Sequence, residues 1–164
     1  MLIAAAALLL AVTPVDPGPA LIGGGHLPSA SDREWAVNRP TRGTHARTVS
    51  LAARVPDGWS AFARCVENRE SHGNPTVLNH EGSGAAGLFQ LMPPWRHGGP
   101  YNARERLIRF GMPKPAAREV RVWLSAHPIH RWPAIYQRVV FAEALDDGLW
   151  WHWRGHTCNG LRPA

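Results

Sequence analysis

Residues 65–95, CVENRESHGNPTVLNHEGSGAAGLFQLMPPW, form the stretch around which the rest of the chain is organised. The stretch begins with the second half of a predicted helix, and that helix ends in a carboxylate, Glu70. Residues 71–75 must end the helix, because they include a Gly and a Pro. Residues 76–88 predict a Gly-rich loop or a small hairpin, and a short apolar run follows. The sequence on either side supplies a leader, a linker and the walls of the domain.

The helix that leads to Glu70 has one apolar face. At about 100° per residue, Glu70 lies in the middle of this face and Glu67 lies nearer its edge. Burial and the negative end of the helix dipole both disfavour ionisation, so we expect the pKa of Glu70 to lie above its reference of about 4.3. A glutamic acid that is still protonated near neutral pH suits a general acid. Asp57 or Ser60 would cap the start of this helix. The apolar residues of the face follow the i, i+3, i+4, i+7 spacing and are Trp59, Phe62, Ala63 and Val66.

A second interpretation of Glu70 is equally open from the helix alone. A Glu at the C-terminal end of a helix commonly reaches solvent or pairs with a cation. Arg64 and Arg69 are both close to it in the sequence. In that case Glu70 would be an ordinary paired carboxylate.

Several features of residues 70–93 occur together in a recognisable order. Glu70 and Ser71 are followed by Gly-Asn-Pro at 73–75 and by Gly-Ala-Ala-Gly-Leu-Phe-Gln-Leu-Met-Pro at 84–93. This order resembles the goose-type lysozyme and lytic transglycosylase superfamily, whose members carry a Glu-Ser at a helix end, a turn and a Gly-Leu-x-Gln-x-Met-Pro segment. The resemblance implies that Glu70 is the catalytic acid. It also implies a mainly α, lysozyme-like fold, with a small hairpin or Gly-rich loop beside the catalytic helix.

The same resemblance implies a sugar-binding groove along the Gly-to-Gln segment. Ser71 would orient the end of the helix, and Gly87 would allow a sugar to approach the backbone closely. The other expected substrate-binding residues are two that line the groove, Asn79 and Gln90, and three that stack on sugar rings, Phe89, Trp95 and Trp151.

The run from Trp150 to Cys158 resembles the end of the actinobacterial transglycosylase-like modules, which include resuscitation-promoting factors. Those modules tend to begin with a Cys just before the catalytic helix ends and to finish with Trp and Cys. The two cysteines of the chain, Cys65 and Cys158, hold these positions, so the resemblance implies a disulfide between them. The alternative is two buried free thiols. A closed loop of about 93 residues would contribute about 4–5 kcal/mol in the chain-entropy model.

The chain divides into three parts. Residues 1–13 predict a signal peptide or short hydrophobic leader, because the apolar run of residues 1–12, as a helix of about 18 Å, is too short for a hydrocarbon core of about 30 Å. Residues 14–55 are rich in Pro, Gly and Arg and predict a basic linker. Residues 56–164 predict one domain. The alternatives are an uncleaved tether or a misassigned start for the leader, and an arm packed on the domain for the linker.

Three further helices are expected within the domain. Asn102 and Glu105 match a capping box ahead of a helix over residues 103–110. Pro115 and Pro133 stand where the first residue of a helix commonly stands. With little strand signal between these helices, the domain should be mainly α.

The chain carries a formal net charge of +6, which implies attraction to a polyanion. Bacterial cell wall, with its peptide carboxylates and anionic polymers, meets this requirement. The Arg residues are scattered and no nucleic-acid-binding motif is present, so no nucleic-acid partner is expected.

The nine His residues include His152 and His156 at i, i+4, but Gly155 makes a regular helix doubtful there. Neither a metal nor a cofactor is therefore expected.

The resemblance as a whole implies a muramidase-type enzyme that is secreted, associated with the cell wall or carried by a virion. It would cut the β-1,4 bond between N-acetylmuramic acid and N-acetylglucosamine in peptidoglycan. Glu67 and Glu81 are candidate second carboxylates, but neither has a defensible spacing, and the Ala-Tyr-Asn-Ala-Gly segment of many lytic transglycosylases is absent. A single carboxylate favours intramolecular attack and a 1,6-anhydro product. The alternatives are a hydrolytic lysozyme and a non-catalytic wall-binding protein on the same scaffold.

Overall fold

The computed structural model describes residues 45–155 and 157–163. This part of the chain is mainly helical, as predicted, and its extended segments pair only in two isolated bridges, Leu78 with Ala86 and Ala86 with Leu91. The bridges close the predicted Gly-rich loop. The helices are α2 (Ala46–Ala52), α3 (Ser60–Ser71), α4 (Trp95–Arg109), α5 (Lys114–Ala126) and α6 (Ala134–Asp146), with the short 3₁₀ helices η1 (Ile129–Arg131), η2 (Leu149–Trp153) and η3 (Asn159–Leu161).

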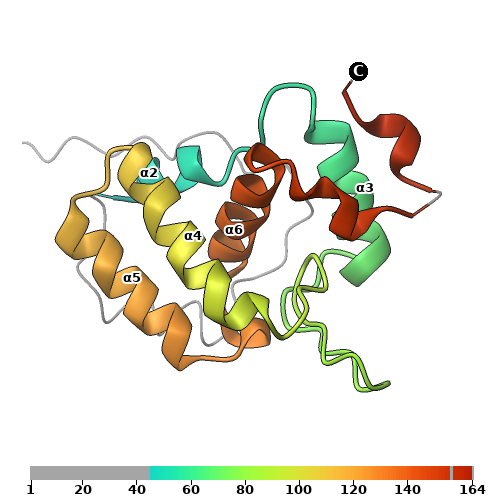
Figure 1. Cartoon of the computed structure of the whole chain (residues 1–164), viewed down its shortest axis with the longest axis horizontal. Coiled ribbons are helices and arrows are strands. Elements are labelled where there is room, and N and C mark those ends of the chain that lie inside the picture. The colour runs from blue at the N-terminus through green and yellow to red at the C-terminus, as the bar shows by residue number, and fades with distance from the viewer. Residues whose placement is uncertain (1–44, 156, 164) are drawn as a thin grey trace, which may run out of the picture.

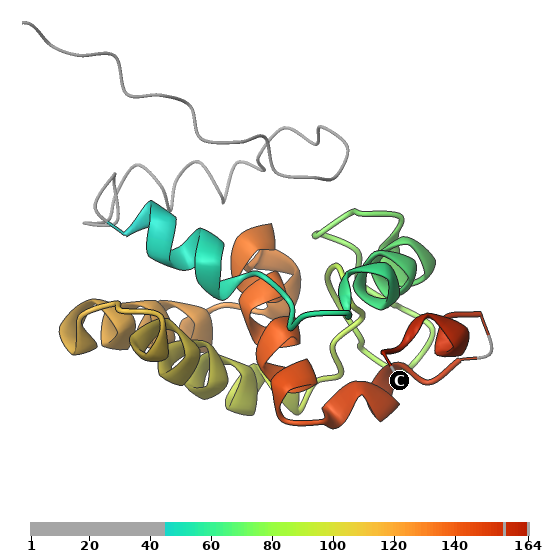
Figure 2. The same ribbon diagram turned by 90° about the horizontal axis from the view of Figure 1, so that it is seen from above.

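Helix α6 is the centre of the fold. It begins at Ala134, one residue after the start predicted at Pro133, and every side chain from Tyr136 to Leu145 except Arg138 is buried. A helix that is buried all round must be covered by other elements. Helices α2 and α4 pack against it, and η2 contacts it beyond its C-terminal end. Figures 1 and 2 show α6 between the α4–α5 pair and the part of the molecule that contains α3.

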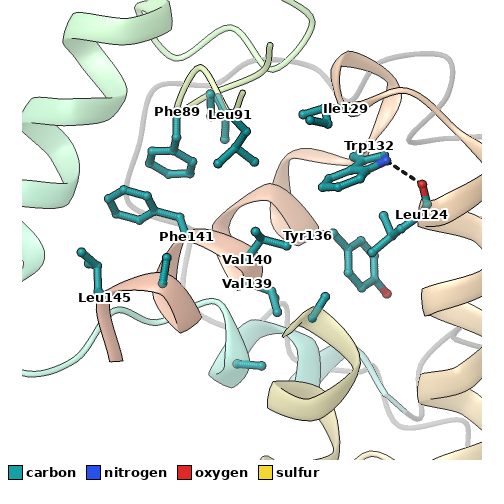
Figure 3. Packing of buried hydrophobic residues seen from close by; sticks show 14 of the residues in the cluster. Phe89, Leu91, Leu124, Ile129, Trp132, Tyr136, Val139, Val140, Phe141 and Leu145 are labelled. Carbon is teal, nitrogen blue, oxygen red and sulfur yellow. Dashed lines mark hydrogen bonds between the residues drawn. The ribbon is translucent and has the colours of Figure 1, made fainter. Parts of the chain in front are cut away.

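Aromatic side chains fill the space between α6 and the loop that follows α3, as Figure 3 shows. The rings of Phe89 and Phe141 stack with their centroids 3.9 Å apart. Trp132 is buried, and its indole N–H lies 2.9 Å from the carbonyl oxygens of both Leu124 and His127. A buried indole needs such an acceptor for its single donor. The loop is therefore anchored in the same core as α6.

Helix α4 begins at Trp95, well before the start predicted at residue 103, and no side chain caps it. The predicted capping box is therefore wrong. Pro100 lies inside the helix, and Gly99 packs so closely that an added Cβ would lie 3.2 Å from the ring of Trp132. Tertiary packing against Trp132 thus outweighs the local tendency of this Gly- and Pro-containing segment to interrupt a helix.

Helices α3 and α5 lie where the sequence predicts them. Helix α5 has Pro115 in its first turn. Helix α3 ends at Ser71, and the next residue, His72, has a left-handed conformation with a φ of 51°. Neither Asp57 nor Ser60 caps α3, because Trp59 occupies the N-cap position and no side chain there bonds to the free backbone N–H groups.

The predicted disulfide between Cys65 and Cys158 is confirmed, with 5.8 Å between the two Cα atoms. It joins the middle of α3 to the C-terminal segment, which lies beside α3 in both Figure 1 and Figure 2. Helix η3, just beyond Cys158, also contacts α3. The end of the chain is thereby tied to the helix that carries Glu70.

Residues 45–55 belong to the folded unit, although the sequence predicts them as the end of a linker. The side chains of Val49 and Ala52 in α2 are buried. Arg106 of α4 donates hydrogen bonds of 2.5 and 2.7 Å to the carbonyl oxygens of Ala52 and Arg54. The boundary predicted at residue 56 is therefore too late.

The remainder of the predicted linker and the predicted leader, residues 1–13, lie outside the described residues. Within the described part of the chain, no helix combines the length and the apolar character needed to cross a bilayer.

Candidate functional site

A pocket of about 240 Å³ opens where the end of α3, the loop after it, the start of α4 and η2 come together. Its polar lining consists of one carboxylic acid, two amides and one imidazole, from Glu70, Asn79, Gln90 and His152. The other lining residues are apolar: Ala85, Phe89, Leu91, Met92, Trp95 and Trp153. A pocket with a few convergent polar groups among aromatic walls is typical of a ligand site.

Glu70 lines this pocket. Its side chain is 25% exposed, so it is less buried than its predicted place in the middle of the apolar face of α3 would make it. Nε and Nη2 of Arg69 donate hydrogen bonds of 2.9 and 2.5 Å to Oε1 of Glu70. The structure thus contains the ion pair that the sequence left open as an alternative. Oε2 of Glu70 accepts no hydrogen bond from the described residues. One carboxylate oxygen therefore remains for a ligand.

Arg69 connects Glu70 to another wall of the pocket. Its Nη2 also donates a hydrogen bond of 3.0 Å to the carbonyl oxygen of Trp153. Gly155 lies against the guanidinium group, because an added Cβ there would be 2.3 Å from Nη1 of Arg69. Nη1 itself is buried and has no hydrogen-bond partner among the described residues. The partly exposed Arg69 side chain thus links Glu70 to η2.

Ser71 is buried and does not line the pocket. Its Oγ lies 2.9 Å from the carbonyl oxygen of Leu88 and 3.0 Å from that of Glu67, and it accepts a hydrogen bond from the N–H of Gly73. Its single proton is donated to one of the two carbonyl groups at a time. Ser71 therefore joins the end of α3 to the loop, which is an orienting role and not a ligand contact.

Asn79 and Gln90 both line the pocket. Oδ1 of Asn79 accepts the backbone N–H of Glu81 at 2.8 Å, and the N–H of Asn79 donates to Ala85 at 2.8 Å. Gln90 has a φ of 46°, which is uncommon for a residue other than Gly, and its Nε2 donates to the carbonyl oxygen of Gly87 at 3.3 Å. Asn79 Nδ2 and Gln90 Oε1 form no hydrogen bond with the described residues, so each amide keeps a polar atom for a ligand.

Two residues expected to contact a sugar serve the core. An added Cβ on Gly87 would lie 2.2 Å from Oε1 of Gln137, so Gly87 makes room for a core side chain and not for a ligand. Phe89 borders the pocket, but its ring is stacked on Phe141 and the residue is only 2% exposed. The ring of Phe89 therefore has no face available for stacking on a sugar.

The aromatic side of the pocket comes from α4 and η2. Trp95 lines the pocket and lies against His152 and Trp153, with ring centroids 5.6 and 6.1 Å away. Trp151 does not line the pocket; it is 46% exposed and stacks on His152 with centroids 3.8 Å apart. Trp151 thus extends the aromatic surface outward from the pocket.

His152 and Trp153 line the pocket without having been predicted from the sequence. The indole N–H of Trp153 donates a hydrogen bond of 2.7 Å to the carbonyl oxygen of Phe89, which joins η2 to the loop. Burial lowers the pKa of His152 below its ordinary value of 6.5. The aromatic run Trp-Trp-His-Trp at 150–153 was the available signal, but no local pattern shows which of its members face a pocket.

The candidate second carboxylates lie elsewhere. Arg138 of α6 donates hydrogen bonds of 2.7 and 3.3 Å to the carboxylate of Glu67, which does not line the pocket. Glu81 is exposed on the loop and does not line it either. Among the described residues that line the pocket, Glu70 is the single carboxylate.

No cluster of three or more potential metal ligands occurs in residues 45–155 and 157–163, and His156 lies outside them.

The chain matches no protein-family model, no curated protein and no solved structure. Its function is therefore inferred from the chemistry of the pocket together with the resemblance of residues 70–93.

Proposed function

We propose that this protein cleaves peptidoglycan glycan strands between N-acetylmuramic acid and N-acetylglucosamine, on a lysozyme-like fold. The observation that carries the proposal is the position of Glu70, the single carboxylate that the described residues place in a pocket whose other polar groups include the amides of Asn79 and Gln90. The order of motifs in residues 70–93, which resembles that of lytic transglycosylases, supports the same assignment.

The lining of the pocket fits the chemistry of a sugar. Asn79 and Gln90 offer amide groups to hydroxyl and acetamido groups, and Trp95 offers an indole ring to the apolar side of a sugar ring. The pocket, at about 240 Å³, is smaller than the roughly 300–1,000 Å³ of common small-molecule sites. It would hold only part of a glycan strand, and the exposed side chains of Met92 and Trp151 beside it would support the rest.

In this reaction Glu70 acts first as a general acid. It gives its proton to the glycosidic oxygen while the bond from that oxygen to C1 of muramic acid breaks towards an oxocarbenium-like state. Glu70 then acts as a base and removes the proton of the muramic 6-hydroxyl, whose oxygen bonds to C1. The product is a 1,6-anhydro sugar, and Glu70 is left protonated for the next cycle. Neither a cofactor nor a metal takes part.

The choice between this transglycosylase reaction and hydrolysis depends on the second nucleophile. A two-carboxylate glycosidase holds a nucleophile or an activated water opposite the acid. Glu70 has no such partner among the described residues that line the pocket. Attack by the 6-hydroxyl is intramolecular and therefore entropically favoured. We therefore favour the 1,6-anhydro product, with lysozyme-type hydrolysis as the alternative outcome at the same pocket.

The proposed setting is outside the cytoplasm, either secreted, bound to the cell wall or carried on a virion. The disulfide between Cys65 and Cys158 is of a kind that persists in oxidising compartments. The net charge of +6 would attract the anionic polymers of a bacterial wall.

A wall-binding protein without catalytic activity is the second candidate. The ion pair between Arg69 and Glu70 favours it, because two hydrogen bonds from the guanidinium group engage the carboxylate that would have to act as the acid. The same pocket would then bind a glycan end without cutting it.

Dye release from labelled cell walls, combined with a wall-binding assay, distinguishes the two candidates. The proposal predicts dye release by the wild-type protein. It also predicts that Glu70→Gln binds walls normally but releases dye about 100- to 10,000-fold more slowly, the range that a general acid contributes. Glu67→Gln is the matched control on the same helix and should retain most of the activity. Wall binding without dye release by the wild-type protein would support the second candidate.

A further inference from the structure

Gln137 is a polar side chain in the middle of the most apolar helix of the fold. It is fully buried in α6, with 0% of its surface exposed. Its Oε1 accepts the backbone N–H of Leu88 at 2.6 Å. Its Nε2 lies 2.8 to 3.3 Å from three backbone carbonyl oxygens, those of Trp132, Pro75 and Ile129. An amide buried in a core is costly unless it is hydrogen-bonded, and here both of its ends have partners.

These hydrogen bonds converge from separate parts of the chain. Leu88 and Pro75 belong to the loop after α3, whereas Ile129 and Trp132 belong to the segment that leads into α6. One side chain therefore fixes the loop to the core at two points. An apolar side chain of similar size would fill the same space but would leave the N–H of Leu88 unpaired.

Gly87 is matched to this arrangement. Its φ of 78° is in the left-handed region, and an added Cβ would lie 2.2 Å from Oε1 and 2.8 Å from Cδ of Gln137. The backbone can approach the amide this closely only because residue 87 lacks a side chain. The pair of Gly87 and Gln137 thus sets the path of the loop just before Leu88.

The peptide groups of Leu88 connect Gln137 to the neighbourhood of Glu70. The N–H of Leu88 bonds to Gln137, and its carbonyl oxygen lies 2.9 Å from Oγ of Ser71, the residue next to Glu70. The two residues after Leu88, Phe89 and Gln90, border the pocket. A change at Gln137 should therefore alter the pocket and the end of α3 together.

We propose that Gln137 is a positioning residue of the pocket. It does not contact the ligand. It holds the N–H of Leu88, and this contact fixes the position of residues 88–90 relative to the C-terminal end of α3, to which Leu88 is joined through Ser71. The consequence for turnover rests on the proposed function, whereas the consequence for the loop does not.

The test uses Gln137→Met, which keeps the length of the side chain and removes both hydrogen-bonding ends. Val139→Ala is the matched control, because Val139 is fully buried two residues further along α6, about 200° around the helix. Hydrogen–deuterium exchange measures protection of the backbone N–H groups of residues 87–91 in the full-length protein. We expect at least tenfold faster exchange at Leu88 in Gln137→Met, with slow exchange retained in α6, and wild-type protection at Leu88 in Val139→Ala.

Wall digestion provides the second measurement. Gln137→Met should lower kcat about tenfold, because it misplaces the acid, and should raise KM as well, because Gln90 moves with residues 88–90. Val139→Ala should keep the wild-type kcat even if it lowers the Tm as much as Gln137→Met does. If the wild-type protein has no wall activity but Leu88 exchanges faster in Gln137→Met, the proposed function fails and the positioning role stands. Folded Gln137→Met with wild-type protection at Leu88 would overturn the role.

A second pair of variants guards against a failure of Gln137→Met to fold. Gly87→Ala should lower the Tm strongly, because its methyl group would collide with Oε1 of Gln137. Adding Gly87→Ala to Gln137→Ala should lower the Tm much less, since the collision is removed and only the unfavourable φ remains. Equal losses in both backgrounds would show that Gln137 does not set the path of the loop.

Discussion

Arg69 holds one oxygen of Glu70 with two nitrogens of its guanidinium group, at 2.9 and 2.5 Å, although the two residues are adjacent in the chain. The same guanidinium group donates to the carbonyl oxygen of Trp153 at 3.0 Å. The carboxylate at the end of α3 is thus positioned by contacts with η2 as well as by its own helix.

Replacing Arg69 tests whether this position matters. Arg69→Ala should reduce the rate of wall digestion about tenfold, because Glu70 loses its contact with η2 and turns between several rotamers. The Tm should change little, since partly exposed ion pairs contribute only about 0–1 kcal/mol. Arg64→Ala is the control, because Arg64 is exposed on the same helix. Turnover at or above the wild-type rate in Arg69→Ala would contradict a positioning role for Arg69.

The disulfide should matter for stability more than for the chemistry of the pocket. Neither Cys65 nor Cys158 lines the pocket, yet the bond closes a loop spanning 93 residues. Changing both cysteines to Ser should lower the free energy of unfolding by about 2–4 kcal/mol. Urea denaturation with and without reducing agent measures this. Wild-type protein whose unfolding midpoint is insensitive to the reducing agent would show that the bond contributes little.

The buried side chain of Arg106 joins three helices. It is 2% exposed and donates to Glu143 and Asp146 of α6 as well as to the backbone of Ala52 at the end of α2. Arg106→Met should destabilise the fold by about 3–5 kcal/mol, because it leaves the buried carboxylate of Glu143 with only a partly exposed partner. Arg104→Met is a matched control.

Arg104 also lies on α4 and pairs with its neighbour Glu105, but both side chains are partly exposed. Its replacement should therefore cost less than about 1 kcal/mol. Chemical denaturation of both variants decides the comparison. Similar losses for Arg104→Met and Arg106→Met would argue against a special contribution from the buried network.

The imidazole of His152 should give the pocket a dependence on pH. Burial lowers the pKa of His152 below 6.5, so the folded protein favours the neutral ring, and this preference is lost as the pH falls through the lowered value. Binding of a chitin oligosaccharide, followed by tryptophan fluorescence, should therefore be constant above about pH 7. It should weaken with a midpoint below 6.5.

Among the described residues, Glu70 is the other titratable group that lines the pocket, and its partner Arg69 lies beside it without lining the pocket. His152→Gln should remove the step in binding, whereas Glu70→Gln should leave it in place. A step that survives in His152→Gln and disappears in Glu70→Gln would assign the pH dependence to the carboxylate.

The helices that could be predicted are those whose signals are local. The apolar spacing of α3 and the prolines at the starts of α5 and α6 each act within one or two turns. The start of α4 could not be predicted in this way. Its Gly99 and Pro100 suggest a break, and the contact that makes a helix favourable comes from Trp132, which is distant in the sequence.

The site shows the same division between local and distant causes. The order of motifs pointed to Glu70, Asn79 and Gln90, and all three line one pocket. The pairing of Glu70 with Arg69 could not be decided, because both interpretations fit the same sequence. The role of Gly87 could not be predicted either, because it depends on a close contact with Gln137, which lies on α6 and is distant in the sequence.

The central claim is that Glu70 cuts glycan strands without a second carboxylate. Mass spectrometry of peptidoglycan digested by the wild-type protein and by Glu70→Gln, before and after borohydride reduction, tests it most directly. We predict muropeptides with 1,6-anhydro ends that borohydride leaves unshifted, from the wild-type protein alone. Products that all gain two hydrogens would show that water is the acceptor. Undigested peptidoglycan with the wild-type protein, or equal digestion by Glu70→Gln, would contradict the claim.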